Sequence, residues 1–537
     1  MPKKQIKKLA LITSYPFILV TILGFFIMPN KVEYLKEIIA FGFLTLIFSS
    51  FIFLFSAKTI KKISFVFSLL ILSILAFIKL SFYANYNAKI SPSALYVIFE
   101  TNENEASDYL SGYFTLNILI ILSIIIILFT TSTIYLFKQT AFNINTKNVY
   151  RYFATIIIAL SAYCIHWKFS NENITLMSIN SYIDYKEIKA NIDENLAHTT
   201  SANIEVVSSL NIPQTYVVII GESASRKHMQ LYGYSRESNP KLKEIKNELI
   251  VFEDVITPNT HTIIALDKIL TLSDYHFPNK DKNASIVQLA NQAGFTTYWI
   301  SNQQPAGFNE SIPTQIGSAA KNKFFLNTHD NKYYNTHDDI LLPTIEKVLS
   351  NKTIKKKILF IHLMGSHILY NKRYPESFNY FKSNKESFKT FDEEAKTTIN
   401  EYDNSIRFND FIVRSIIETT RKAKTNSYVL YFSDHGDDVY DTSDTFLGHG
   451  EYYGTKPMYT IPFIVWLSDS YKKQFPYMFN DLSIVKRPYI LEDFIHSFSE
   501  ISHINFKKIN YKKSIFNKDF KVKKRIIKKD EDYDKKK

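Results

Sequence analysis

The sequence predicts a two-part protein, in which a bundle of five membrane-spanning α-helices precedes an α/β domain with a mostly parallel central sheet. Two observations predict this fold class. The long apolar stretches of the 537-residue chain lie before residue 168, whereas the part after residue 213 alternates short β-branched or aromatic runs with helical segments. So uneven a distribution of apolar residues is typical of a membrane part joined to a water-exposed domain.

Five stretches within residues 1–167, the predicted transmembrane domain, are predominantly apolar and mostly near the ~20 residues that a helix needs to cross a bilayer. The predicted spans are Leu9–Met28, Ile38–Ala57, Ile63–Tyr83, Leu116–Phe137 and Tyr152–Trp167. A cleaved signal peptide is the alternative for the first, but its full-length apolar run, with no small-residue cleavage pattern and another span close behind, favours a membrane helix. Lys79 lies near the end of the third stretch, where its ammonium group is expected to reach the interface.

The distribution of lysine and arginine predicts the orientation of these spans. Residues 1–8 carry four lysines, and the links after the second and fourth spans carry three basic residues each. The link at 84–115 has one lysine against four acidic residues. Because basic links remain in the cytoplasm, the N-terminus is expected there, and five crossings place everything after Trp167 outside. In a bacterium, that side is the periplasm or the cell surface.

The net charge of +13 does not predict a nucleic-acid partner. Residues 506–537 hold 14 lysines and arginines against five acidic residues, so this segment supplies most of the excess. We expect a solvated basic tail that can contact anionic membrane lipids. The only cysteine, Cys164, lies in an apolar stretch, which excludes an intramolecular disulfide and a cysteine-based zinc site.

The second half divides into a polar linker at residues 168–213 and a domain at residues 214–505. Buried strands are predicted at Tyr216–Ile220, Thr296–Ile300, Ile358–His362, Tyr428–Phe432 and Ile461–Leu467. Continuous apolar strands that alternate with helices indicate a mostly parallel sheet covered on both faces. Such sheets place ligands beyond the carboxyl ends of their strands.

Polar residues at these strand ends predict a metal site. Glu222 follows the first strand, and Asp434 and His435 follow the fourth. Two carboxylates and an imidazole suit zinc or a similar divalent ion. A hydroxyl that contacts such an ion can act as a nucleophile. The candidates, among which spacing alone does not choose, are Ser223, Ser225, Thr260 and Thr262.

An ordered set of motifs resembles the bacterial phosphoethanolamine transferases. The motifs are Gly221–Arg226 (GESASR), Leu231–Glu237 (LYGYSRE), Thr257–Ile263, His362–His367 (HLMGSH), Ser433–Gly436 (SDHG) and Gly448–Glu451 (GHGE). The resemblance covers essentially the whole chain, because members of that family have five membrane helices before an alkaline-phosphatase-like, sulfatase-like domain. Many relatives brace that domain with disulfides, which this chain cannot form.

The resemblance implies roles for particular residues. One zinc ion would be surrounded by Glu222, Thr262, Asp434 and His435, with Thr262 as the nucleophile. Thr260 is a rival, although the interval from Glu222 favours Thr262. Three further residues would hold the phosphate, protonate the leaving group, contact substrate or bind a second zinc ion: His367, His449 and Asn302.

The implied reaction moves phosphoethanolamine from phosphatidylethanolamine onto the threonine and then onto an acceptor at the cell surface. Lipid A, a core sugar of lipopolysaccharide, another glycan and a protein all remain open as acceptors. The pattern is closer to the branch that modifies core sugars or several acceptors than to the branch confined to lipid A. The alternatives are a phosphoglycerol transferase of the lipoteichoic-acid-synthase type, a less favoured arylsulfatase and a catalytically silent membrane scaffold.

Overall fold

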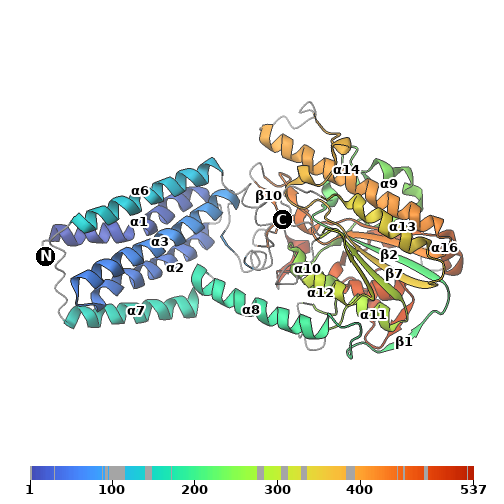
Figure 1. The fold of residues 1–537 in the computed structure, drawn as a ribbon, viewed down its shortest axis with the longest axis horizontal. Coiled ribbons are helices and arrows are strands. Elements are labelled where there is room, and N and C mark those ends of the chain that lie inside the picture. Colours follow the sequence, from blue (N-terminus) through green and yellow to red (C-terminus); the bar gives the residue numbers. More distant parts are fainter. Residues whose placement is uncertain are drawn as a thin grey trace. The chain divides into compact units, whose positions relative to one another are not determined.

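The computed structural model consists of two compact units, which are described separately (Figure 1). The first ends at Tyr185 and the second begins at Lys186. The structure describes all residues except 1–2, 29–30, 87–88, 91–94, 96–114, 139–147, 171, 275–282, 304–311, 328–335, 383–392, 444–445, 452–453, 477–481, 529 and 537.

The first unit is built from long helices. They are α1 (Lys3–Ile27), α2 (Lys31–Phe51), α3 (Lys58–Tyr86), α6 (Leu116–Lys138), α7 (Asn148–Lys168) and the first half of α8 (Ile174–Asn195), whose second half belongs to the second unit. Among the described residues, four helical segments are long and apolar enough to span a membrane: Tyr34–Leu54, Lys58–Ala84, Leu116–Lys138 and Asn148–Lys168. The predicted count of five is therefore too high by this measure. Lysines occupy the first turns of α1, and its apolar part, Leu11–Ile27, is shorter than the other four.

A buried ion pair lies between two helices of this unit. The ammonium group of Lys79 on α3 is 2.6 Å from a carboxylate oxygen of Glu37 on α2, and both side chains are 4% exposed. The hydroxyl of Tyr83 donates to the other Glu37 oxygen. The expectation that Lys79 reaches the interface is therefore wrong, because a carboxylate inside the bundle binds the ammonium group. Breaking such a buried pair costs about 3–5 kcal/mol.

The second unit is built around a seven-stranded sheet of order β3-β11-β8-β2-β7-β5-β6. The strands are β2 (Gln214–Gly221), β3 (Leu249–Val251), β5 (Thr296–Ser301), β6 (Asn322–Phe325), β7 (Lys356–His362), β8 (Asn426–Ser433) and β11 (Phe463–Leu467). β8, β2, β7, β5 and β6 are parallel, and β11 is antiparallel to both of its neighbours. The mostly parallel sheet predicted from the apolar runs is confirmed.

Alternating residues of β2 face two separate hydrophobic cores. Val218 and its even-numbered neighbours pack against α10 (Thr262–Ile269), α11 (Ile286–Gln292), α12 (Ile312–Ser318) and α17 (Phe494–Ile501). Val217 and Ile219 pack against α13 (Leu342–Ser350) and α14 (Glu393–Lys422) on the opposite face. Figure 1 shows α10, α11 and α12 on one side of the sheet and α13 and α14 on the other. Because β2 is buried on both faces, its sequence is a continuous apolar run.

Two segments differ from the sequence prediction. The predicted linker, 168–213, contains the whole of α8 and a strand, β1 (Val206–Ser209), which pairs with β13 (Ile504–Phe506). The predicted solvated tail packs on the domain, where Arg525 is buried and its guanidinium group lies 2.7 Å from Asp254. The prediction of a solvated tail rested on the number of charged residues alone. It did not take account of the apolar residues between the lysines, which are buried: Ile515, Phe516, Ile527 and Tyr533.

Candidate active site

The register of three neighbouring strands brings distant polar residues together. On one side of β2, Ile220 lies opposite His362 of β7, and on the other side Gly221 lies opposite Ser433 of β8. Glu222 and Asp434 are the next residues along β2 and β8. They therefore emerge side by side at the carboxyl edge of the sheet, where α/β folds bind ligands.

The loop after β7 closes tightly over Glu222. Gly365 has a φ of +55°, and a Cβ atom there would lie 2.6 Å from the backbone oxygen of Glu222. The backbone N–H of Ser366 donates to the same oxygen at 2.9 Å. Only glycine has both the conformation and the space that this approach requires.

Glu222, Asp434 and His435 form a buried cluster whose potential ligand atoms all lie within 4.8 Å of one another. The Nε2 atom of His435 is 3.3 Å from Oε1 of Glu222 and 3.5 Å from Oδ2 of Asp434. That Oδ2 atom is buried and has no hydrogen-bond partner among the described residues. A buried carboxylate oxygen without a donor is costly. Two carboxylates and one imidazole in this arrangement therefore fit a divalent ion such as zinc.

The charges in the cluster also favour a cation. Burial raises the pKa of Asp434, and the neighbouring Glu222 carboxylate raises it further. Burial opposes ionisation of Glu222, yet hydrogen bonding and charge from His435 hold its pKa well below the usual range. Burial also lowers the pKa of His435, but the two carboxylates outweigh this effect and raise it. The cluster therefore requires positive charge, which is supplied by a proton on His435 or by a metal ion.

Thr262 is the threonine that contacts this cluster. It begins α10, its Oγ1 atom donates to Oε2 of Glu222 at 3.0 Å, and the same atom lies 3.2 Å from Nε2 of His435. The backbone N–H and the hydroxyl of Thr260 instead donate to Oε2 of Glu451, at 2.9 and 3.0 Å. A hydroxyl held by Glu451 is turned away from the cluster, so the geometry separates the two threonines.

The two serine candidates occupy different environments. The hydroxyl of Ser223 donates to Oε1 of Glu222 at 2.8 Å, but this side chain is fully buried. The hydroxyl of Ser225 donates to the backbone oxygen of Pro457 at 3.0 Å and does not contact the cluster. Thr262 therefore combines contact with the cluster and partial exposure.

His449 belongs to a second group of potential metal ligands, which it forms with His435 and Asp437. Its Nδ1 atom is 2.6 Å from Oδ1 of Asp437, whose other oxygen accepts the hydroxyl of Tyr370 at 2.6 Å. The Nδ1 atom of His367 is buried without a hydrogen-bond partner among the described residues, and burial lowers the pKa of this side chain to about 4. A neutral imidazole with an available nitrogen can bind a metal ion or a phosphate-bearing ligand.

The structure does not place Asn302 in the cluster. Its amide donates to the backbone oxygen of Thr336 at 3.2 Å and to Oδ1 of Asp338 at 2.9 Å. Asp338 in turn accepts the backbone N–H groups of Met364 and Gly365. Asn302 therefore helps to hold the loop after β7, and no hydrogen bond among the described residues joins it to Glu222.

Sequence reasoning missed three residues near the site. Asp437 orients His449, Glu451 holds Thr260, and His261 precedes α10 with its ring centre 5.2 Å from that of His449. The Ser433–Gly436 motif, directly before Asp437, was the available signal for that residue. The contact between Glu451 and Thr260 joins positions 191 residues apart and has no local signal.

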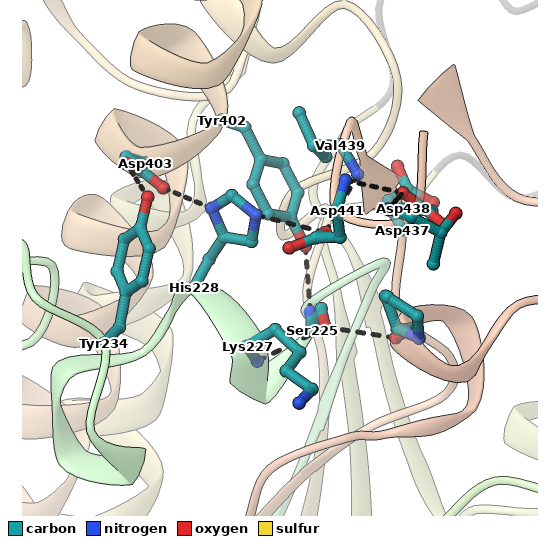
Figure 2. A network of polar contacts seen from close by, with 12 residues as sticks. Ser225, Lys227, His228, Tyr234, Tyr402, Asp403, Asp437, Asp438, Val439 and Asp441 are labelled. Carbon is teal, nitrogen blue, oxygen red and sulfur yellow. Dashed lines mark hydrogen bonds and ion pairs between the residues drawn. The ribbon is translucent and has the colours of Figure 1, made fainter. Parts of the chain in front are cut away.

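A buried histidine connects the segment after Glu222 to α14, as Figure 2 shows. The two ring nitrogens of His228 lie 2.7 Å from Asp403 and 3.3 Å from Asp441. Burial lowers its pKa, but the two carboxylates outweigh this effect and raise the pKa to about 10. Asp403 also accepts the hydroxyl of Tyr234 at 2.9 Å. This network fixes the segment that leads away from Glu222.

The sulfatase family model matches residues 214–504, which is more than half of the chain. Phosphoethanolamine transferase EptC of Escherichia coli (strain K12) is 32% identical over 469 residues, covering 82% of this chain and 80% of the relative. The chain belongs to the sulfatase family and, within it, to the phosphoethanolamine transferases. Phosphoethanolamine transferase CptA of Salmonella typhimurium, another transferase of this kind, is 31% identical over 471 residues, with 82% and 80% coverage.

Solved structures of phosphoethanolamine transferases share the fold. The C-terminal periplasmic domain of EptC from Escherichia coli in complex with Zn is 33% identical, with a TM-score of 0.57, and the match covers 61% of this chain and 92% of that one. The integral membrane transferase EptA from Neisseria meningitidis is 18% identical, with a TM-score of 0.65. The match covers 96% of this chain and 98% of that one. The second match extends the shared fold to the helical unit.

Proposed function

We propose that this chain transfers phosphoethanolamine from phosphatidylethanolamine to an acceptor glycolipid through a covalent threonine intermediate. The observation that carries the proposal is the contact of the Thr262 hydroxyl with both Glu222 and His435 at the carboxyl edge of the sheet. Relatives that match over most of their length are named phosphoethanolamine transferases, which favours this reaction over phosphoglycerol transfer.

In the first step, Oγ1 of Thr262 bonds to the phosphorus of phosphatidylethanolamine and the bond to the diacylglycerol oxygen breaks. Glu222 accepts the hydrogen bond of the attacking hydroxyl, orients it and takes its proton as the bond to phosphorus forms. His449, held by Asp437, is positioned to give a proton to the departing oxygen. In the second step an acceptor hydroxyl gives its proton to His449 and bonds to phosphorus, the bond to Oγ1 of Thr262 breaks, and this oxygen recovers its proton from Glu222. Division into two steps is the advantage of a covalent intermediate.

The residues that would hold one zinc ion are Glu222, Thr262, Asp434 and His435. Zinc bound there lowers the pKa of a contacting hydroxyl and offsets charge on the phosphate oxygens. The unpartnered Oδ2 atom of Asp434 supports this assignment. His449 and His367 are available for the phosphate or for a second ion, and Asn302 would act only through the loop that it braces.

The acceptor that we propose is lipid A or a core sugar of lipopolysaccharide. A relative of Escherichia coli that is 28% identical over 274 residues is named Kdo(2)-lipid A phosphoethanolamine 7''-transferase. The apolar helices of the first unit suit a donor and an acceptor that are both anchored in membranes. The proposed location is the inner membrane of a bacterium, with the α/β unit in the periplasm.

Purified full-length protein in detergent should release diacylglycerol from phosphatidylethanolamine that carries a labelled ethanolamine. When rough lipopolysaccharide is added, the label should appear on the glycolipid. Phosphatidylglycerol, supplied in a parallel reaction, should remain intact. Consumption of phosphatidylglycerol with no release of diacylglycerol from phosphatidylethanolamine would favour the phosphoglycerol alternative.

The proposed orientation can be tested with reporters fused after Asn145 and Asn211. Because basic links remain in the cytoplasm, a fluorescent protein should be active after Asn145 and alkaline phosphatase after Asn211. A third reporter before Met1 tests whether α1 crosses the membrane, since its apolar part is the shortest. Cytoplasmic signal after Asn211 would contradict the proposed location.

A further inference from the structure

A groove of about 910 Å³ lies beside the edge of the central sheet. β3 is the last strand of the sheet, and among the described residues it pairs only with β11, which leaves its outer edge without a strand partner there. Leu249, Ile250 and Val251 of β3 are partly exposed and line the groove. Residues of the segment that follows Glu222 in the chain also line it, from Arg226 and Lys227 to Leu231–Ser235.

The strand register places this groove within reach of the candidate active site. Val251 lies opposite Ile464 of β11, which lies opposite Tyr431 of β8. Two strand spacings and three residues along β8 separate Val251 from Asp434, or about 10 Å in each direction. An acceptor glycolipid is long enough to occupy the groove and the site together.

The groove carries an excess of positive charge. Arg226, Lys227 and Lys246 line it, and Glu253 is its one acidic residue among the described residues. Lys227 and Lys246 are exposed and form no ion pair with any described residue. Figure 2 shows the ammonium group of Lys227 apart from every contact drawn there. The guanidinium group of Arg226 lies 3.8 Å from Asp254 and donates to the backbone oxygen of Val255 at 3.5 Å.

Two tyrosines give the groove rigid aromatic surfaces. The hydroxyl of Tyr232 donates to the backbone oxygen of Phe463, and that of Tyr234 donates to Asp403, so both rings are anchored at their polar ends. Both side chains are partly exposed along the groove. Fixed rings beside unpaired ammonium groups suit a ligand with sugar faces and phosphate groups.

We propose that this groove binds a phosphate-bearing part of the acceptor glycan while the accepting oxygen lies at Thr262. The inference rests on the proposed function and adds a binding site for the acceptor. The ligand class is a phosphorylated saccharide. An extended peptide added to the edge of β3 would bind mainly through backbone hydrogen bonds and would depend little on the lysines.

Binding of fluorescently labelled rough lipopolysaccharide to the full-length protein in detergent tests the inference. Replacing both exposed lysines (Lys227→Glu with Lys246→Glu) should raise the Kd about tenfold at low salt, because two attractive contacts become repulsive. The difference should shrink in 0.5 M salt, as expected for exposed charges. It should vanish for lipopolysaccharide that has been chemically dephosphorylated.

The matched control replaces two exposed lysines on the helices that cover one face of the sheet, Lys347→Glu with Lys422→Glu. This variant has the same net charge and should keep the wild-type Kd. The inference would be overturned if the groove variant had the same Kd as the wild type. It would also be overturned if the Kd rose equally in the groove variant and in the control. Binding is measured without turnover, so failure of the proposed reaction is detected separately, as a lack of diacylglycerol release by the wild type.

Discussion

Replacing Thr262 by alanine should reduce phosphoethanolamine transfer by about 10³-fold or more, because the attacking oxygen is removed. The hydroxyl that contacts Glu222 and His435 disappears, whereas the start of α10 is retained. Thr262→Ser keeps a hydroxyl and should retain part of the rate. Mass spectrometry of protein incubated with phosphatidylethanolamine should find phosphoethanolamine on the peptide that contains Thr262, and only when residue 262 carries a hydroxyl.

Thr260→Ala is the matched control for this experiment. Its hydroxyl is held by Glu451, so the substitution should cost about 1 kcal/mol of stability and leave the adduct on residue 262. Because both residues lie in one proteolytic fragment, fragmentation within the peptide must locate the adduct. An adduct on Ser223 or Thr260 would refute the assigned nucleophile and leave the reaction class intact.

Replacing Asp434 by asparagine should abolish both zinc binding and transfer. The substitution keeps the shape of the side chain but removes the charge, and burial already raises the pKa of Asp434. The metal-free domain should therefore remain folded and can be more stable than the wild type, since repulsion with Glu222 is relieved. Zinc content, measured by elemental analysis after dialysis, should fall at least tenfold. A tenfold loss of zinc affinity corresponds to about 1.4 kcal/mol of binding free energy.

Asp410→Asn tests whether loss of any buried carboxylate gives the same result. Asp410 lies on α14 and accepts the backbone N–H groups of Lys241 and Leu242, outside the zinc-site cluster. This variant should lose stability and keep its zinc. Chelation of the wild type should stop transfer, and added zinc should restore it. If Asp434→Asn and His435→Ala both retain zinc and turnover, the assigned site is wrong.

The parts of the site that could be predicted are those governed by strand periodicity. Apolar runs located β2 and β8, and the rule for parallel sheets then brought Glu222 and Asp434 to one edge, as observed. The choice between Thr260 and Thr262 could not be made from spacing, because it depends on the long-range contact with Glu451. Asn302 follows a strand at the same edge, but its amide is directed to Asp338.

The fold was less predictable where charge and burial compete. Lys79 carries the charge expected at a membrane interface, but Glu37 on another helix binds it, and no local pattern shows that pairing. The C-terminal lysines predicted a solvent-exposed segment, whereas Ile515, Phe516 and Tyr533, which lie between them in the sequence, are buried. In both segments the deciding contact joins residues far apart in the chain, which composition does not record.

The docking of the C-terminal segment joins residues that are made late to a strand near the candidate active site. Arg525 binds Asp254, which directly precedes β4 (Val255–Ile256), the strand that leads toward Thr262. The hydroxyl of Thr257, next after that strand, donates to the backbone oxygen of Asp434. Chains grow from the N-terminus, so the contact beside this strand forms only after Arg525 has been synthesised. A stop codon after residue 524 would therefore leave a protein that contains every candidate catalytic residue but lacks the contact of Arg525 with Asp254, directly before β4.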